Sequence, residues 1–383
     1  MAEVRSSVSR RTLTRSQRSL HRAGEGVVTG HLFKIIREGI PLTQRALAEH
    51  FGVDTSTVQA WESGRRPLTA VASAQFFQLR RHLLRHGADP ALLLQLDVAM
   101  EADSVISHAL DQGPAGDDFH THPLSGWVFT RASTHMIAWA LNGARPAAVP
   151  APPSHAPRRR GPTPDSPILG VTERTHLFDH LRRFAEIADR AGDEGALLRR
   201  QALYLCSYDT RPDTQEWIGH MQNNRARTGR VGWTPQWADE RSVATSLTRY
   251  GDMEPLHDFI QYGLAEDSGE SANLNYWAYW LGLDRIPRVD DRFMADPATG
   301  QWDALALLRS LADRLAPGLG CVDLNVHSVW ALIASRHGVL AADPELNRDL
   351  SERVAGLLDT DGISSRSRRE LESVHYGLRL SRQ

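Results

Sequence analysis

Residues 43–67 constrain the fold of this chain more than any other segment, because their sequence predicts two short helices joined by a tight turn. Thr43 stands where an N-cap hydroxyl belongs, and apolar residues follow it at helical spacing. Gly52 falls where the chain must reverse, a position that commonly needs the positive φ that glycine adopts at little cost. Asp54 then predicts the N-cap of a second helix.

The second helix has a buried side and an outward side. Val58 and Trp61, three residues apart, are predicted to pack against Leu47 and Phe51 of the first helix. Gly64 ends the helix, and the proline after it prevents its resumption. The outward side, near the helix start, carries Thr55, Ser56 and Gln59. Small polar side chains in this place are typical of a helix that reads base edges in the major groove of DNA.

This segment resembles the Cro/cI-type, or XRE, helix-turn-helix family, and the likeness extends over residues 27–87. The matching residues are Thr43-Gln44, Leu47-Ala48, Gly52-Val53, Val58, Trp61-Glu62, Gly64 and Pro67. The resemblance implies a lambda-repressor-like domain that binds double-stranded DNA. The chain lacks the glutamine pair with which some phage members open the recognition helix, so their target sequence does not transfer.

The resemblance also implies roles for single residues. The base-contacting residues would be Thr55, Ser56, Gln59 and Ala60. The phosphate-contacting residues would be Gln44, Arg45, Arg65 and Arg66. Arg37 and Glu62 would form a partly buried ion pair that fixes the helices against each other.

Charge separates this part of the chain from the rest. Residues 1–88 hold 14 basic and 6 acidic side chains, whereas the remainder holds 30 basic and 40 acidic ones. A basic segment on an otherwise acidic protein is the electrostatic pattern of a nucleic-acid-binding module. The alternative, two packed helices used for protein contacts, does not account for this charge.

Composition indicates a cytoplasmic protein of bacterial type. No apolar run approaches the ~20 residues that cross a bilayer, and residues 1–24 lack the apolar core of a secretory signal. We expect 1–24 to be a disordered basic arm, with wrapping of DNA as the alternative. Cys206 and Cys321 are too few for a disulfide framework and are expected to be reduced.

The remaining sequence divides at a proline-rich stretch. We predict a DNA-binding domain over 25–110, a helical connector over 111–144, a linker over 145–167 and a regulatory or dimerisation domain over 168–383. The fold class is all-α, with strand-like alternation scarce throughout. Short turns between the C-terminal helices suggest helical hairpins of a tetratricopeptide-like kind, although no clean repeat period is present.

Ten helices are predicted in the C-terminal domain, at 175–191, 195–206, 212–224, 235–249, 253–264, 272–283, 303–315, 325–335, 344–358 and 366–378. Within 273–282, Tyr276, Trp277 and Trp280 share one face. We interpret them as packing residues, with a ligand-binding aromatic wall as the alternative. The two asparagines beside them are the part that packing explains least.

No catalytic motif stands out, and we expect no enzyme activity, no cofactor and no metal site. The chain has no phosphate-cradling glycine loop, no Gly-x-Ser-x-Gly elbow and no His-Glu-x-x-His helix. His120 and His122 have a spacing that can bind metal, but no third ligand stands near them in the sequence.

These patterns predict a sequence-specific transcriptional regulator that acts as a homodimer, because one short recognition helix reads too few base pairs alone. The C-terminal domain would serve dimerisation or bind a small-molecule, peptide or protein effector. This organisation resembles that of peptide-responsive regulators with a helical receptor domain. The alternative is an interaction scaffold or antitoxin-like protein that uses DNA binding for autoregulation.

Overall fold

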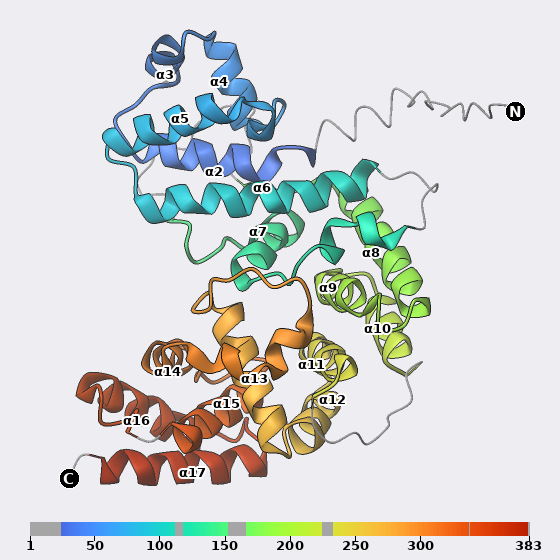
Figure 1. The fold of residues 1–383 in the computed structure, drawn as a ribbon, viewed down its shortest axis with the longest axis vertical. Helices are drawn as coiled ribbons and strands as arrows, with labels where there is room; N and C mark the ends of the chain where they lie inside the picture. The colour runs from blue at the N-terminus through green and yellow to red at the C-terminus, as the bar shows by residue number, and fades with distance from the viewer. Residues whose placement is uncertain (1–23, 112–117, 152–165, 224–232, 337, 382–383) are drawn as a thin grey trace, which may run out of the picture. The chain divides into compact units, whose positions relative to one another are not determined.

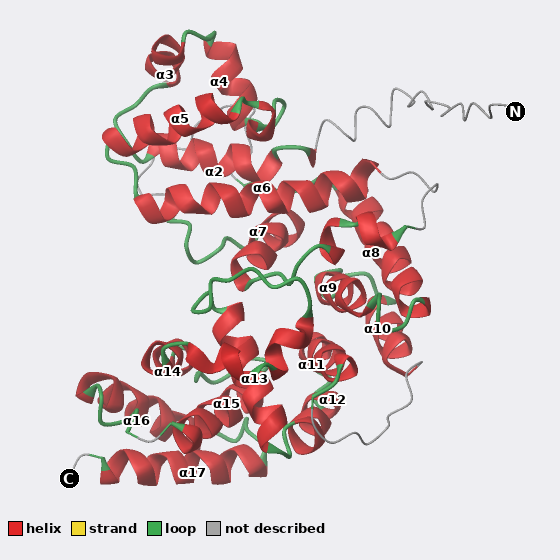
Figure 2. Cartoon of the chain, in the orientation of Figure 1, coloured by secondary structure: helices red, strands yellow, loops and turns green. Residues whose placement is uncertain are grey.

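The computed structural model describes residues 24–111, 118–151, 166–223, 233–336 and 338–381. Over these ranges the chain consists of helices and turns without a β-strand, which confirms the all-α prediction (Figure 2). None of the described helices is both long enough and apolar enough to cross a membrane. The predicted basic arm, apart from Gly24, lies outside the described residues.

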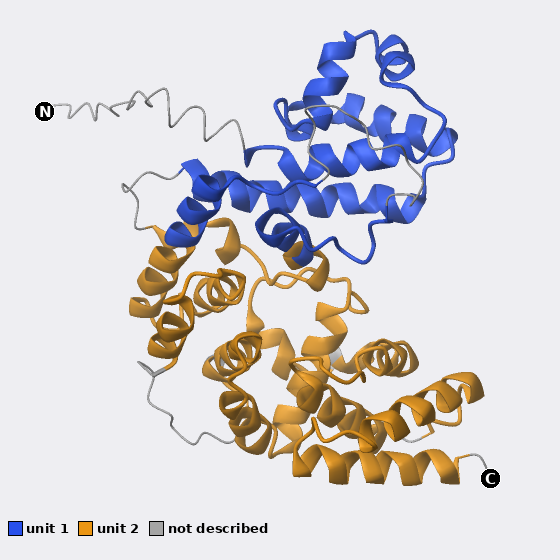
Figure 3. Cartoon of the chain, turned by 180° about the vertical axis from the view of Figure 1, so that it is seen from behind, with its two compact units in different colours: residues 1–116, 135–180 blue, residues 117–134, 181–383 orange. Residues whose placement is uncertain are grey.

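The chain forms two compact units, and their boundary does not follow the proline-rich stretch (Figure 3). Unit 1 comprises 1–116 and 135–180, and unit 2 comprises 117–134 and 181–383. The chain returns to unit 1 after the proline-rich stretch, because the Leu169 N–H donates to the Ala140 carbonyl at 2.9 Å. The predicted linker 145–167 therefore joins two parts of one unit, and its residues 152–165 lie outside the described ranges. The predicted connector 111–144 is divided between the units.

In unit 1, residues 24–111 form three longer helices and two short ones (Figure 1). They are α2 (Val27–Glu38), α3 (Gln44–Phe51), α4 (Thr55–Glu62), α5 (Ser73–Arg85) and α6 (Pro90–Asp111), with a 3₁₀ turn at Leu68–Ala70. Helix α2 packs against α6 and α4, and α3 packs against α4. The division between the units passes through α7 (Arg131–Asn142) and α8 (Val171–Arg190).

A buried carboxylate on α6 caps the start of α2. Asp103 is 2% exposed, and its two oxygens accept hydrogen bonds from the backbone N–H groups of Val28 and Thr29, each at 2.9 Å. These N–H groups have no partner within their own helix. Gly26 at the N-cap has no side chain that could accept from them, and the Asp103 carboxylate takes that role. Burial raises the pKa of Asp103 to about 7, against the opposing effect of these hydrogen bonds.

The ten predicted C-terminal helices are present, with ends that differ by at most five residues from the prediction. The first is α8, which the division between the units crosses, and the other nine lie in unit 2. They are α9 (Ala196–Cys206), α10 (Thr214–Asn223), α11 (Pro235–Leu247), α12 (Glu254–Asp258) continued by a π turn (Phe259–Gly263), α13 (Asp267–Trp280), α14 (Ala304–Ala312), α15 (Val322–Ser335), α16 (Pro344–Leu358) and α17 (Ser365–Leu380). Three 3₁₀ turns, Thr248–Tyr250, Asp291–Ala295 and Pro297–Gln301, were not predicted.

The aromatic helix α13 runs through the core of unit 2. Tyr276, Trp277 and Trp280 are all less than a tenth exposed, and the rings of Tyr276 and Trp280 stack with centroids 5.9 Å apart. These residues therefore pack, as predicted. The buried asparagines beside them bond neighbouring elements: Asn275 Nδ2 donates to the Met294 carbonyl at 2.8 Å, and Asn273 Nδ2 donates to Ser328 Oγ at 2.9 Å.

Candidate nucleic-acid interface

The turn between α3 and α4 has the backbone that its sequence predicts, with one exception. Thr43 Oγ1 accepts the Ala46 N–H at 3.1 Å, so Thr43 caps α3. Gly52 has φ of 61°, the left-handed region that favours glycine. Asp54 has the extended backbone of an N-cap, but its carboxylate makes no capping bond to α4. Asp54 is therefore the N-cap residue of α4, as predicted, but its side chain does not cap the helix.

Helix α4 packs against α2 through its apolar side. Val58 and Trp61 are at most 2% exposed, and the Trp61 ring meets Phe33 of α2 edge to face at 6.4 Å. Phe51 was expected to pack on this side. Its ring contacts the ring of His82 on α5, with the centroids 5.5 Å apart. The two aromatic contacts thus tie α4 to α2 and α3 to α5.

A glycine lets the backbones of α2 and α4 approach closely. A Cβ atom at Gly30 would run into the Trp61 carbonyl oxygen and would stand 2.9 Å from the Gly64 nitrogen. Gly64 itself has φ of 71° and lies against Gly26. No side chain larger than hydrogen fits at Gly30 without moving backbone, so this position sets the depth at which α4 is held.

The predicted ion pair between Arg37 and Glu62 is present and buried. Arg37 Nη2 lies 3.2 Å from Glu62 Oε2, and Arg37 Nε donates to Glu62 Oε1. Both residues are at most 6% exposed. Gln44 Nε2 also donates to Glu62 Oε2, at 2.5 Å, so one carboxylate joins α2, α3 and α4.

The outward side of α4 carries the four predicted base-contacting residues. Ser56 and Gln59 are exposed, and Thr55 and Ala60 are half-buried. Gln59 Nε2 donates to Gln44 Oε1 at 3.4 Å. Gln44, the predicted phosphate contact at the start of α3, thus has both ends of its amide engaged by neighbours. We call Thr55, Ser56, Gln59 and Ala60 the α4 face.

The predicted phosphate-contacting arginines differ in whether a carboxylate pairs with them. Arg65 and Arg66 are exposed just after α4, and Arg65 Nε donates to the Ser63 hydroxyl at 3.0 Å. Arg45 instead pairs with Glu49 one turn along α3, with Nε–Oε1 at 2.8 Å. Arg80 of α5 is also paired, because its Nη1 lies 3.1 Å from both carboxylate oxygens of Asp97. Arg65 and Arg66 are therefore the cations best placed beside the α4 face.

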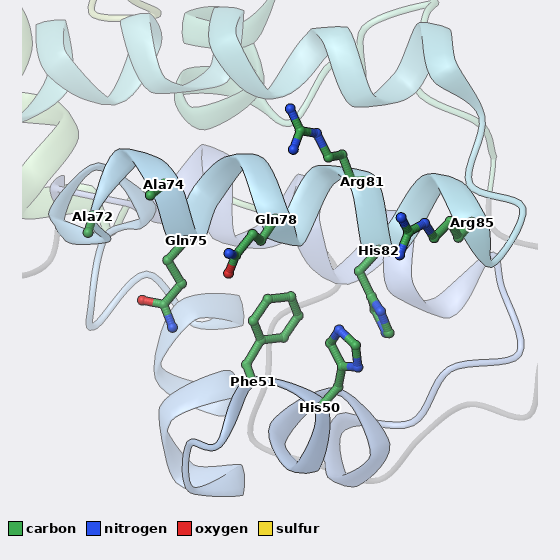
Figure 4. A pocket seen from close by; sticks show the side chains of 9 residues that line it. All are labelled: His50, Phe51, Ala72, Ala74, Gln75, Gln78, Arg81, His82 and Arg85. Carbon is green, nitrogen blue, oxygen red and sulfur yellow. The ribbon is translucent and has the colours of Figure 1, made fainter.

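A polar pocket of about 530 Å³ opens between α3 and α5 (Figure 4). His50 and Phe51 point from α3 toward α5, and Gln78 and His82 point back toward them. The nine lining residues, none of them acidic, are His50, Phe51, Ala72, Ala74, Gln75, Gln78, Arg81, His82 and Arg85. Arg81 and Arg85 make the lining of this pocket basic.

His82 is the buried group of this pocket. Its ring is 7% exposed, stacks on His50 at 3.6 Å and has no hydrogen-bond partner at Nε2 among the described residues. Burial lowers the pKa of His82 to about 4, with repulsion from His50, His86 and Arg85 acting in the same direction. His82 is therefore neutral at pH 7.

Other predicted or missed residues have structural roles. His122, one of the two histidines whose spacing can bind metal, accepts the Leu124 N–H on Nδ1 at 3.0 Å. Gly30 and Asp103 were not singled out by the sequence. A glycine inside an amphipathic helix was a usable signal for the first, and an aspartate among apolar residues of α6 for the second.

No protein-family model, curated protein sequence or solved structure matches this chain.

Proposed function

We propose that the chain is a sequence-specific DNA-binding transcriptional regulator of the Cro/cI helix-turn-helix type. Its α4 would enter the major groove and read bases with the α4 face. The observation that carries this proposal is the contrast between the two sides of one short helix. Val58 and Trp61 are buried by α2, whereas Ser56 and Gln59 stand exposed near the helix start.

The way α4 is held supports the same proposal. A reading helix must keep its angle to the rest of the domain while its outer residues contact bases. The close approach at Gly30 and the Arg37–Glu62 pair supply that rigidity from the side away from the α4 face. Arg65 and Arg66 follow the helix directly, where they would contact phosphates and set the register.

The rest of the proposal follows from the size of the reading surface. A single eight-residue helix contacts too few base pairs for useful specificity, so we expect a homodimer on paired half-sites. Unit 2, as a tetratricopeptide-like or other helical array, would provide dimerisation or effector binding. We place this activity in the bacterial cytoplasm and expect it to need no enzyme chemistry, metal or cofactor. An autoregulating scaffold or antitoxin-like protein remains the second candidate.

The test is selection of bound duplexes from a random pool with the full chain, followed by sequencing. We expect one motif with two half-sites. The double variant Ser56→Ala, Gln59→Ala should bind that motif more weakly, by roughly 1–3 kcal/mol for each lost base contact, and should relax its sequence. Ser104→Ala, which removes an exposed serine hydroxyl on α6, is the matched control.

Two results would sink the proposal. The first is the absence of any enriched sequence for the wild-type chain. The second is an unchanged motif for the double variant, which would mean that α4 does not read bases.

A further inference from the structure

Unit 2 buries several arginines, and most of them have a carboxylate partner. Arg199 is fully buried and lies between Asp189 and Asp239, with Nε–Oδ1 to Asp189 at 2.8 Å. Arg200 makes a two-pronged pair with Asp291, with Nε–Oδ2 at 2.8 Å. This is the usual condition for a buried guanidinium, because an unpaired charge away from water is strongly unfavourable.

Arg241 of α11 breaks this rule. It is 5% exposed, yet its only side-chain hydrogen bond among the described residues is from Nε to Asn273 Oδ1, at 3.1 Å. Its Nη2 atom is also buried, and no described residue accepts a hydrogen bond from it. The guanidinium lies over the rings of Tyr276 and Trp277, at 4.1 and 5.0 Å from their centroids.

A second arginine shares the same aromatic ring. Arg314, which follows α14, lies over Trp277 at 5.0 Å, and its buried Nε has no partner among the described residues. The Cζ atoms of Arg241 and Arg314 each lie 5.0 Å from the Trp277 centroid, so the two atoms are at most twice 5.0 Å apart. Burial lowers the pKa of Arg314 to about 10, and repulsion from Arg131 and Arg241 adds to the effect.

The platform that carries these cations is fixed. Trp277 Nε1 and Asn273 Nδ2 both donate to Ser328 Oγ at 2.9 Å. The amide of Asn273 is thereby oriented so that its oxygen faces Arg241. A rigid platform holding two guanidinium groups with free N–H donors matches what a bound oxyanion requires.

We propose that Arg241 and Arg314, on the Trp277 platform, form a binding site for the phosphate or carboxylate group of a small anionic ligand. The oxyanion would accept from Arg241 Nη2 and Arg314 Nε and would replace the carboxylate that these arginines lack. The anion site stands on unit 2 alone and does not depend on DNA binding by unit 1.

The test uses inorganic phosphate as the probe and the full chain. Thermal unfolding and calorimetric binding are measured over a phosphate series, with sodium chloride holding the ionic strength constant. We expect saturable binding and a melting temperature that rises with phosphate concentration. Arg241→Met should weaken binding at least about tenfold, the loss of a charge-assisted hydrogen bond. Without phosphate it should melt no lower than the wild type, because it removes an unpaired buried charge.

Arg314→Met, at a half-buried position, is the second variant if Arg241→Met fails to fold, and it should show the same loss. Arg348→Met removes an exposed arginine of α16 and should leave phosphate binding intact. The proposal is overturned if phosphate does not bind saturably, or if the wild type and both site variants respond alike. It is also overturned if Arg241→Met melts several degrees lower in phosphate-free buffer, since that result assigns Arg241 a structural role.

Discussion

The Glu62 carboxylate at the end of α4 is buried against the Arg37 guanidinium of α2, with Nη2–Oε2 at 3.2 Å. The pair connects the candidate reading helix to the helix beneath it, and Gln44 of α3 joins the same carboxylate. The Glu62 carboxylate is therefore buried, ion-paired and hydrogen-bonded at once. The pair therefore predicts where unit 1 is most sensitive to substitution.

Replacing Glu62 with alanine should destabilise unit 1 by about 3–5 kcal/mol, because Arg37 is left as a buried charge without its partner. The measurement is hydrogen exchange of the α2–α6 peptides together with the melting temperature. Glu49→Ala removes an exposed partner of Arg45 and should leave both readouts unchanged. Equal protection in the two variants would contradict a stabilising role for the buried pair.

Gly30→Ala should cost about 1–3 kcal/mol or more, because the added methyl group meets the backbone at Trp61 and Gly64. Gly39→Ala is the matched control at the end of the same helix. Gly39 has φ of −74°, and a Cβ there stands 3.5 Å from its nearest neighbours. The control should stabilise the unit by about 0.4–1 kcal/mol. Urea denaturation of the two variants compares them directly, and a stable Gly30→Ala protein would show that α2 and α4 are not in close backbone contact.

Arg66→Gln should weaken binding to all DNA sequences alike. It should also reduce the slope of log affinity against log salt concentration by about 0.9, the value for one phosphate contact. The slope is measured on the selected duplex and on an unrelated duplex between 50 and about 200 mM salt. Arg348→Gln, at an exposed position of α16, is the control for loss of one positive charge. A changed base preference in Arg66→Gln would instead assign Arg66 to base reading.

The contribution of His82 to the stability of unit 1 should fall as the pH drops from about 6.5 to about 4. Its folded pKa is depressed, so the unfolded chain binds the proton first, and the native state loses stability across that window. The loss is up to about 3 kcal/mol, the free energy of the pKa difference. His82→Phe should lack it.

The measurement is the difference in unfolding free energy between wild type and His82→Phe from pH 8 to pH 4. Asp103, whose pKa of about 7 gives an opposite slope, is present in both proteins and cancels. A difference that does not change with pH would mean that His82 titrates normally in the folded chain.

Local sequence signals determined the helices and the turn. Thr43, Gly52 and the apolar spacing of 43–67 predicted α3 and α4, because capping and positive φ are properties of a few neighbouring residues. The same holds for the ten C-terminal helices and for the buried face of α13. The pairing of Arg37 with Glu62 was accessible only through the resemblance to a known family.

Only the tertiary structure decided what distant residues do to one another. The cap of α2 comes from Asp103, some 75 positions away, and the carboxylate of Asp54, the local candidate for the next helix, makes no cap. The proline-rich stretch joins two parts of one unit, because Leu169 bonds back to Ala140. Nothing in the sequence distinguished Arg241 from the paired Arg199 and Arg200. Whether a buried charge has a partner depends on the residues that lie near it in space. Sequence periodicity carries no information about those residues.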